Sequence, residues 1–239
     1  IDLVDYIDGT YNTLDTVDKR AIFGHSMGGY GALSNALRNP DLYVGVGTHG
    51  GVIDLTTAIN GITPFVLEEN GGGGPYSPTA GVWTEVMYSM AAAWSPNTLN
   101  EPEPVDFPLN DDGEILDSVF EDWKEDDPVD IARALTPSTQ PAIYLQVGED
   151  DELWDVVAMA CRDSLSGIGL DVRFEMHPGV HNNALGERFP YTLAFFDSLF
   201  FHGTDAPERG FNPVPQQFEL QPVHPNPFNG TTRCEVRLP

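Results

Sequence analysis

Ser26 stands between two glycines, Gly24 and Gly28, in the stretch AIFGHSMGGYGAL. Glycine permits the backbone conformations of a tight turn, so a short strand can pass into a helix within a few residues. A serine at such a turn has a strained backbone, and its hydroxyl projects above the edge of the sheet. The pattern predicts that Ser26 is a nucleophile. The alternative is a helix N-cap serine flanked by incidental glycines.

A serine hydroxyl is a poor nucleophile near neutral pH, so it needs a base and an acid that orients the base. Two later loops offer these groups. Asp151 follows the apolar run 142–147, and His181 follows the run 171–176. Both lie after predicted strands, in the order Ser, Asp, His that accompanies a nucleophile elbow in α/β-hydrolases. We therefore predict that Asp151 is the acid and His181 the base.

Neighbouring residues compete for these roles. Glu149 and Asp150 share the acidic loop of Asp151, so the choice between Asp150 and Asp151 stays open at this point. His177 comes at a strand end, where a structural role is the expected one. His25 adjoins the serine and should point away from its hydroxyl, as a packing or pocket residue. Two further histidines give no functional signal: His49 and His202.

The helix that follows the serine supplies a further element of the predicted site. Its N-terminal end carries a partial positive charge, and the backbone N–H of Met27 is placed to donate to an oxyanion on an acyl group. In the predicted reaction His181 takes the proton of Ser26, and the serine attacks an ester carbonyl. Water then releases the acid. This chemistry needs no metal and no organic cofactor, so we expect neither.

These residues require a frame of strands and helices. Short strands are expected at 21–23, 42–51, 142–147 and 171–176, and helices near 27–37, 153–166 and 188–202. Alternation of strands and helices predicts an α/β fold with a parallel sheet. Near the N-terminus, Leu3, Ile7 and Tyr11 recur every four positions, as in an amphipathic helix.

A long, loop-rich insertion is expected over about 52–135. It contains NGGGGP at 70–75 and, between 101 and 130, 13 acidic residues against the single Lys124. No Gly-Lys-Ser/Thr follows the glycines, which argues against a phosphate-binding loop, and the acidic residues lack the ligand spacing of a calcium loop. The alternatives are a solvated acidic surface and a lid or substrate wall over the active site.

The composition argues against several classes of binding partner. The net charge of −26 disfavours binding to nucleic acid or to anionic membrane surfaces. No apolar run is long enough to span a bilayer. The two cysteines, Cys161 and Cys234, indicate neither a disulfide framework nor metal-ligand spacing.

The segment YIDGTYNTLDTVDKRAIFGHSMGGYGAL resembles the elbow region of the putative esterase family, which includes S-formylglutathione hydrolases, feruloyl and acetylxylan esterases and antigen-85 mycolyltransferases. The resemblance covers about 1–203 and implies an α/β-hydrolase fold with Ser26 as nucleophile. The family's Gly-x-x-Asp and Gly-x-His loops match 148–151 and 179–181. Family members carry further strands and a second oxyanion donor before the elbow, so we expect this chain to lack its N-terminal strands.

The C-terminal residues 218–239 are similar to the opening of the type IX secretion sorting domain of Bacteroidetes-like bacteria. The hallmark YPNPFNP occurs here as HPNPFNG. The resemblance implies export by the type IX secretion machinery, with the protein released or held at the cell surface. We expect a catalytic domain over 1–203, a Pro-rich linker over 204–217 and the start of a sorting domain over 218–239, in a chain that is clipped at both ends.

The combined expectation is a secreted serine esterase that hydrolyses carboxylic esters of small molecules or of polysaccharides. Three alternatives stay open. The same three residues serve acyltransferases and peptidases, and a hydrolase fold that has lost activity can act as a surface-binding module. The intact Ser26, Asp151 and His181 argue against the last of these.

Overall fold

The computed structural model describes residues 2–72, 77, 81–135 and 140–202, and four short strands between 219 and 237. The chain divides into two compact units, Ile1–Asp205 and Ala206–Pro239. In the second unit two antiparallel pairs form: β5 (Glu219–Leu220) with β8 (Val236–Arg237), and β6 (His224–Asn229) with β7 (Thr231–Arg233). The linker expected over 204–217 lies outside the described residues, and the sorting domain stays a prediction.

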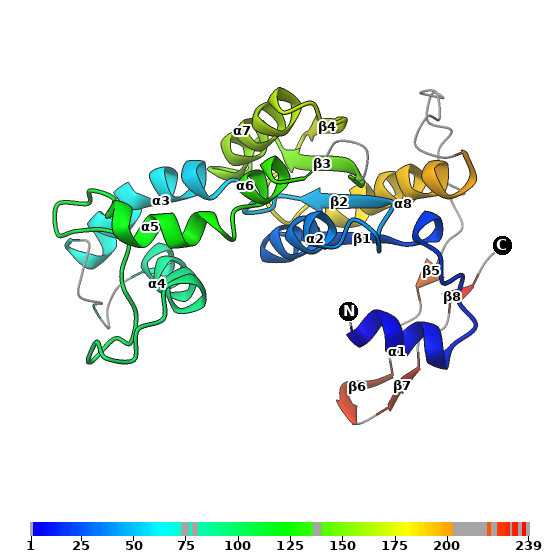
Figure 1. The fold of residues 1–239 in the computed structure, drawn as a ribbon, viewed down its shortest axis with the longest axis horizontal. Coiled ribbons are helices and arrows are strands. Elements are labelled where there is room, and N and C mark those ends of the chain that lie inside the picture. Colours follow the sequence, from blue (N-terminus) through cyan, green and yellow to red (C-terminus); the bar gives the residue numbers. More distant parts are fainter. Residues whose placement is uncertain are drawn as a thin grey trace. The chain divides into compact units, whose positions relative to one another are not determined.

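A four-stranded sheet forms the centre of the first unit (Figure 1). Its strands are β1 (Ala21–His25), β2 (Gly45–His49), β3 (Ala142–Gly148) and β4 (Val172–His177), in that order, and every neighbouring pair is parallel. All four predicted strands are therefore confirmed. Because the carboxyl ends of parallel strands meet at one edge, the residues that follow β1, β3 and β4 can converge on a common site.

Helices cover both faces of this sheet. One face packs against α2 (Met27–Arg38), α6 (Pro128–Arg133) and α7 (Trp154–Gly167), and the other against α8 (Leu185–His202). Successive side chains of β3 point to opposite faces. Ile143 and Leu145 join the core beneath α2 and α7, whereas Tyr144 packs against Phe195 of α8. The arrangement is the α/β-hydrolase type of layering that the sequence predicts.

The segment between β2 and α6 is more helical than the sequence analysis expected. It contains α3 (Leu55–Asn70), α4 (Val82–Trp94) and α5 (Asp117–Lys124), which lie together in Figure 1 and share a core of their own. The buried side chains of α3 recur at helical spacing, but Gly61 and Pro64 within the helix weaken the signal. The loop-rich description fits 95–116, where the structure shows isolated bridges instead of strands.

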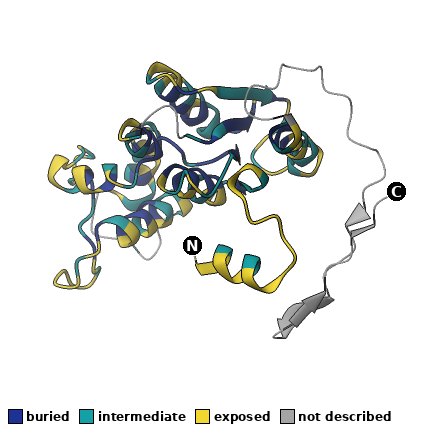
Figure 2. Ribbon diagram, turned by 45° about the vertical axis from the view of Figure 1, so that its right-hand side comes forward, coloured by how far each residue is buried: buried dark blue, intermediate teal, exposed yellow. Residues whose placement is uncertain are grey.

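The N-terminal helix differs from the others because it buries no residue. The amphipathic pattern does form α1 (Asp2–Thr10), yet Leu3 and Tyr6 on it are exposed, and Figure 2 shows the helix mostly in yellow. The Asp8 carboxylate holds the Arg20 guanidinium at 2.5 Å, next to β1. Among the described residues no helix is both long and apolar enough to cross a membrane.

Candidate active site

The turn at Ser26 is a strained junction between β1 and α2. Ser26 has φ 55° and ψ −125°, a conformation that is rare for a residue with a side chain. A Cβ atom on Gly24 would lie 1.8 Å from the carbonyl oxygen of Gly28, so the two backbones can approach only without that side chain. A Cβ on Gly28 would meet open space instead. At Gly29, in contrast, an added Cβ would lie only 3.0 Å from the Cα of Gly51, so this glycine allows a second close approach of two backbones.

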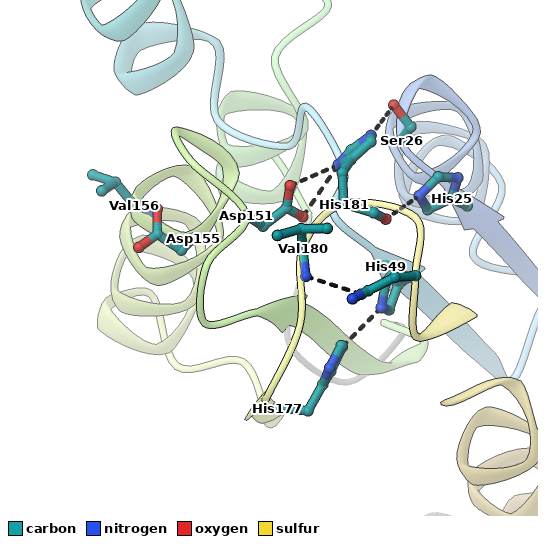
Figure 3. A network of polar contacts seen from close by, with 10 residues as sticks. His25, Ser26, His49, Asp151, Asp155, Val156, His177, Val180 and His181 are labelled. Carbon is teal, nitrogen blue, oxygen red and sulfur yellow. Dashed lines mark hydrogen bonds and ion pairs between the residues drawn. The ribbon is translucent and has the colours of Figure 1, made fainter. Parts of the chain in front are cut away.

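Three of the predicted site residues come together at this turn (Figure 3). Nε2 of His181 lies 2.8 Å from Oγ of Ser26, and Nδ1 lies 2.9 and 3.1 Å from the two carboxylate oxygens of Asp151. Nδ1–H donates to the carboxylate, which leaves Nε2 free to accept the hydroxyl proton. Burial raises the pKa of the Asp151 carboxyl, and the neighbouring His181 opposes that shift. The alternative acids, Glu149 and Asp150, are both exposed.

The loops that carry Asp151 and His181 are joined through their backbones. The N–H groups of Glu149 and Asp150 donate to the carbonyls of His177 and Gly179, at 2.8 and 3.0 Å. A Cβ on Gly148 would lie 2.3 Å from the Gly179 carbonyl oxygen. The two loops therefore hold each other in place independently of the contact between Asp151 and His181.

Gly50 is a site residue that the sequence analysis did not single out. It has φ +55°, and a Cβ at this position would lie 2.8 Å from Oδ2 of Asp151 and 3.1 Å from Nδ1 of His181. Only glycine fits both the backbone conformation and the space. The available signal was the Gly-Gly pair directly after β2, because this strand ends at the same sheet edge as the strands before the acid and the base.

The histidines that the sequence analysis set aside also surround the site. Nε2 of His25 lies 2.9 Å from the carbonyl oxygen of His181, and Nε2 of His49 lies 2.8 Å from Nε2 of His177. Burial, followed by the charge of His177, lowers the pKa of His49 to about 3. The His25 ring contacts the loop that carries His181, and its centroid lies 4.8 Å from that of the His181 ring. The side chain of His202 lies outside the described part of the chain.

The predicted oxyanion donor occupies the first position of α2. The Ser26 carbonyl accepts from the N–H groups of Gly29 and Tyr30, whereas the N–H of Met27 at the helix start has no acceptor within the helix. The Met27 side chain is exposed. In the residues that the structure describes, no group of three or more His, Cys, Asp or Glu side chains is arranged to hold a metal ion.

A row of aromatic rings leads away from the base. The ring centroid of Trp154, at the start of α7, lies 6.3 Å from that of His181. Trp83 on α4 lies 6.1 Å further along, and Phe65 on α3 stacks on Trp83 at 5.4 Å. None of the three rings is fully buried. Through Trp154 the row connects two helices of the insertion with the ring of His181.

Comparison with known proteins relates the chain to a family and to solved structures of similar fold. The sequence model of a family described as "Putative esterase" matches residues 2–165, whereas comparison with curated sequences gives no match. Two similar solved structures are a ferulic acid esterase (18% identity, TM-score 0.50, 83% of this chain and 58% of that one) and a fluorophosphonate-binding serine hydrolase F of Staphylococcus aureus (19%, 0.50, 85% and 62%). At these identities the likeness supports the fold, and the chain spans less than two thirds of either structure.

Proposed function

Because the chain belongs to the putative esterase family, we propose that the protein hydrolyses carboxylic esters through an acyl-enzyme on Ser26. The observation that carries the proposal is the continuous hydrogen-bonded chain from Oγ of Ser26 through the His181 ring to Asp151. The strained backbone of Ser26 supports it as well, because strain at a polar residue in a site of this kind is a feature of activated nucleophiles.

Each residue has one role in the proposed reaction. His181 accepts the hydroxyl proton on Nε2 while Oγ of Ser26 bonds to the ester carbonyl carbon. The carbonyl oxygen becomes an anion next to the N–H of Met27, and His181 then gives its proton to the leaving alcohol. A water molecule, deprotonated by His181, then attacks the acyl carbon. The bond to Oγ breaks, the acid leaves, and His181 returns the proton to Oγ of Ser26. Asp151 keeps the imidazole oriented and stabilises its charged form.

The proposed substrate lies with its apolar part along the row formed by Trp154, Trp83 and Phe65. These rings begin at the base, so a group bonded to the reacting carbonyl can reach them. Half-buried tryptophan rings offer a large apolar surface at a small cost in conformational entropy. The ferulic acid esterase among the similar structures acts, by its name, on esters of ferulic acid. We propose an ester that carries an apolar or ring-containing group.

The experiment that tests the reaction compares the protein with Ser26→Ala. Incubation with p-nitrophenyl acetate and with a fluorophosphonate probe should give hydrolysis and labelling of Ser26. Ser26→Ala should lose labelling and lower kcat by about 10⁴-fold or more. Ser89→Ala is a matched control, because Ser89 is an exposed serine on α4 that donates to the Glu85 carbonyl. Absence of both signals in the unaltered protein would overturn the proposal.

Two further experiments identify the base and distinguish ester hydrolysis from acyl transfer and peptide cleavage. His181→Ala should lower kcat as strongly as Ser26→Ala, whereas loss of activity in His177→Ala alone would assign the base to His177. Product analysis with added sugar or amine acceptors distinguishes hydrolysis from acyl transfer, and a peptide amide substrate tests peptidase activity. An ester product that replaces the free acid would assign the protein to the acyltransferases.

The location of the protein is a separate proposal. The resemblance of 218–239 to a type IX sorting domain supports export to the medium or the cell surface, in agreement with the net charge of −26. In a host with type IX secretion, the full chain should reach the medium or surface, and a variant that ends at residue 203 should stay in the cell. Equal export of the two would contradict the proposal.

A further inference from the structure

Four of the six histidines, His25, His49, His177 and His181, lie together at the carboxyl edge of the sheet (Figure 3). The proposed reaction uses only His181. We infer that His25 is a positioning residue that fixes the backbone of His181, and that the His49–His177 pair fastens the same loop at its start. The inference rests on the proposed function, because it takes His181 as the base.

His25 and Ser26 are neighbours in the chain, and both contact the same residue. Nε2 of His25 lies 2.9 Å from the carbonyl oxygen of His181, while Oγ of Ser26 lies 2.8 Å from Nε2 of that residue. A carbonyl oxygen only accepts hydrogen bonds, so the Nε2 atom of His25 carries the proton. The elbow therefore holds the base at two points, its backbone and its ring, and the distance between nucleophile and base is fixed from one strand end.

The second contact fastens the loop where it leaves β4. Nδ1 of His177 lies 3.2 Å from the carbonyl oxygen of Pro178, so Nδ1 is the protonated nitrogen of that ring. Its Nε2 then accepts from Nε2–H of His49, at 2.8 Å. This assignment leaves Nδ1 of His49 without a proton, in agreement with the absence of a hydrogen-bond partner for that buried atom among the described residues. Both rings are buried and nearly parallel, at an interplanar angle of 17°.

The loop between β4 and α8 needs such support because His181 lies in a turn rather than in a strand or helix. Displacing a catalytic group by about 1 Å can lower a rate about 100-fold. The backbone contact of Asp150 with Gly179 fixes the loop two residues before the base. The His25 contact reaches the backbone of His181 itself.

The first test replaces the donor of His25 while keeping the bulk of its side chain. His25→Leu should lower kcat by about 10- to 100-fold with little change in KM. His25→Gln, whose Nε2 can donate from a similar position, should recover most of the loss. Leu199→Ala on α8 is the control for general destabilisation, since Leu199 is buried in a different core; it should lower the melting temperature without lowering kcat. Equal kcat values for the Leu and Gln variants would overturn the inference.

The second test does not depend on turnover. Long-range ¹⁵N–¹H NMR of the unaltered protein should show protons on Nε2 of His25, Nε2 of His49 and Nδ1 of His177. The low-field proton on Nδ1 of His181, which donates to Asp151, should broaden in His25→Leu and persist in His25→Gln. A proton on Nδ1 rather than Nε2 of His25 would overturn the inference. A protein that hydrolyses no ester but shows the expected protons would refute the proposed function and leave the positioning contact in place.

Discussion

Two buried carboxyl groups illustrate how the sheet region and the insertion differ. Asp151 and Asp127 are equally shielded from solvent, each with 2% of its surface exposed. Asp151 faces the ring of His181, whereas Asp127 accepts from the backbone N–H groups of Leu55 and Val129, at 3.0 and 2.8 Å. In the proposed reaction the first carboxylate orients the base, and the second joins two helix starts. The partner, and not the burial, decides whether an acidic residue serves chemistry or architecture.

The two regions are nevertheless connected. Asp127 links the first residue of α3 to the start of α6, so it holds the insertion where the chain leaves the sheet and where it returns. Leu153, two residues after Asp151, packs against Gly61 of α3, where a Cβ would lie 2.1 Å from its Cδ1 atom. The insertion thus contacts the loop that carries Asp151 directly. Substitutions in each region can therefore measure how strongly the stability of the insertion and the geometry of the site depend on each other.

The largest effect on the insertion is expected from Asp127→Ala. The substitution leaves two buried N–H groups without an acceptor, which should cost about 3 kcal/mol of unfolding free energy. Asp54→Ala is the matched control, because Asp54 accepts from a single N–H, that of Thr57, and its loss should cost about 1 kcal/mol. Denaturant unfolding measures both. Equal losses for the two variants would contradict the double role of Asp127.

The next prediction compares two glycines with positive φ, one next to the site and one in the insertion. Gly50→Ala places a methyl group against Asp151 and His181 and should lower kcat about 100-fold. Gly71→Ala, at the C-terminal end of α3, has φ +75° and open space around the new atom, so it should cost about 1 kcal/mol of stability and leave kcat unchanged. Steady-state kinetics and thermal melts of the two variants test this. Normal kinetics in Gly50→Ala would show that the space next to the triad is not limiting.

The pH dependence of stability should contain two opposing contributions. The pKa of His49 is lowered from 6.5 to about 3, mainly by burial. The unfolded chain therefore binds a proton that the folded one does not, and this contribution to stability is full above pH 6.5 and is lost as the pH falls towards 3. Burial raises the pKa of Asp127 from 3.8 to about 6. Its contribution has the opposite sign: it is full below pH 3.8 and is lost as the pH rises through 6.

Melting temperatures between pH 3 and 7 separate these contributions. His49→Gln keeps a donor for His177. Its melting temperature should fall less steeply than that of the unaltered protein as the pH is lowered from 6.5 towards 3. The melting temperature of Asp127→Asn should fall less than that of the unaltered protein as the pH rises from 4 to 6. Parallel curves for both variants and the unaltered protein would exclude the two groups as the source of the pH dependence. Four neighbouring groups also lower the pKa of His49 through their charge: His177, His25, His181 and Arg188.

The smallest effect concerns the rings that the insertion presents to the site. Trp83→Ala should raise KM for an ester with an aromatic acyl group about fivefold, corresponding to about 1 kcal/mol of lost contact, with little change in kcat. For p-nitrophenyl acetate, whose acyl group is too small to reach Trp83, the change in KM should be smaller. An equal increase for both esters would show that the row does not contact the acyl group.

The sheet and its reactive residues were readable from the sequence because their signals are local. Short apolar runs mark the strands, and Gly24, Ser26 and Gly28 mark the turn after β1. Asp151 and His181 could be placed because parallel strands end at one edge. Their burial and their mutual distance are tertiary properties, so the sequence could not choose firmly between Asp150 and Asp151.

Other parts of the site gave weak or misleading signals. Gly50 leaves no room for a side chain because Asp151 and His181 lie against it. These two residues are distant in the chain, so no local sequence pattern encodes the contact. His49 received no role from its position, since its partner His177 is 128 residues away in the chain. In α3, Gly61 and Pro64 masked an apolar face of helical spacing. Asp127 belongs to an acidic stretch that the sequence analysis treated mainly as a solvated surface or a substrate wall, yet it is buried.

The long separation of nucleophile and base along the chain has a consequence for the timing of activity. Ser26 and His181 are 155 residues apart, and the acid lies between them. During synthesis the N-terminal part of a domain emerges and begins to fold first. A nascent chain that has folded through β3 already presents its serine and its acid but no base. The proposed hydrolysis can therefore begin only when β4 and the segment before α8 have left the ribosome and docked, late in the production of the protein.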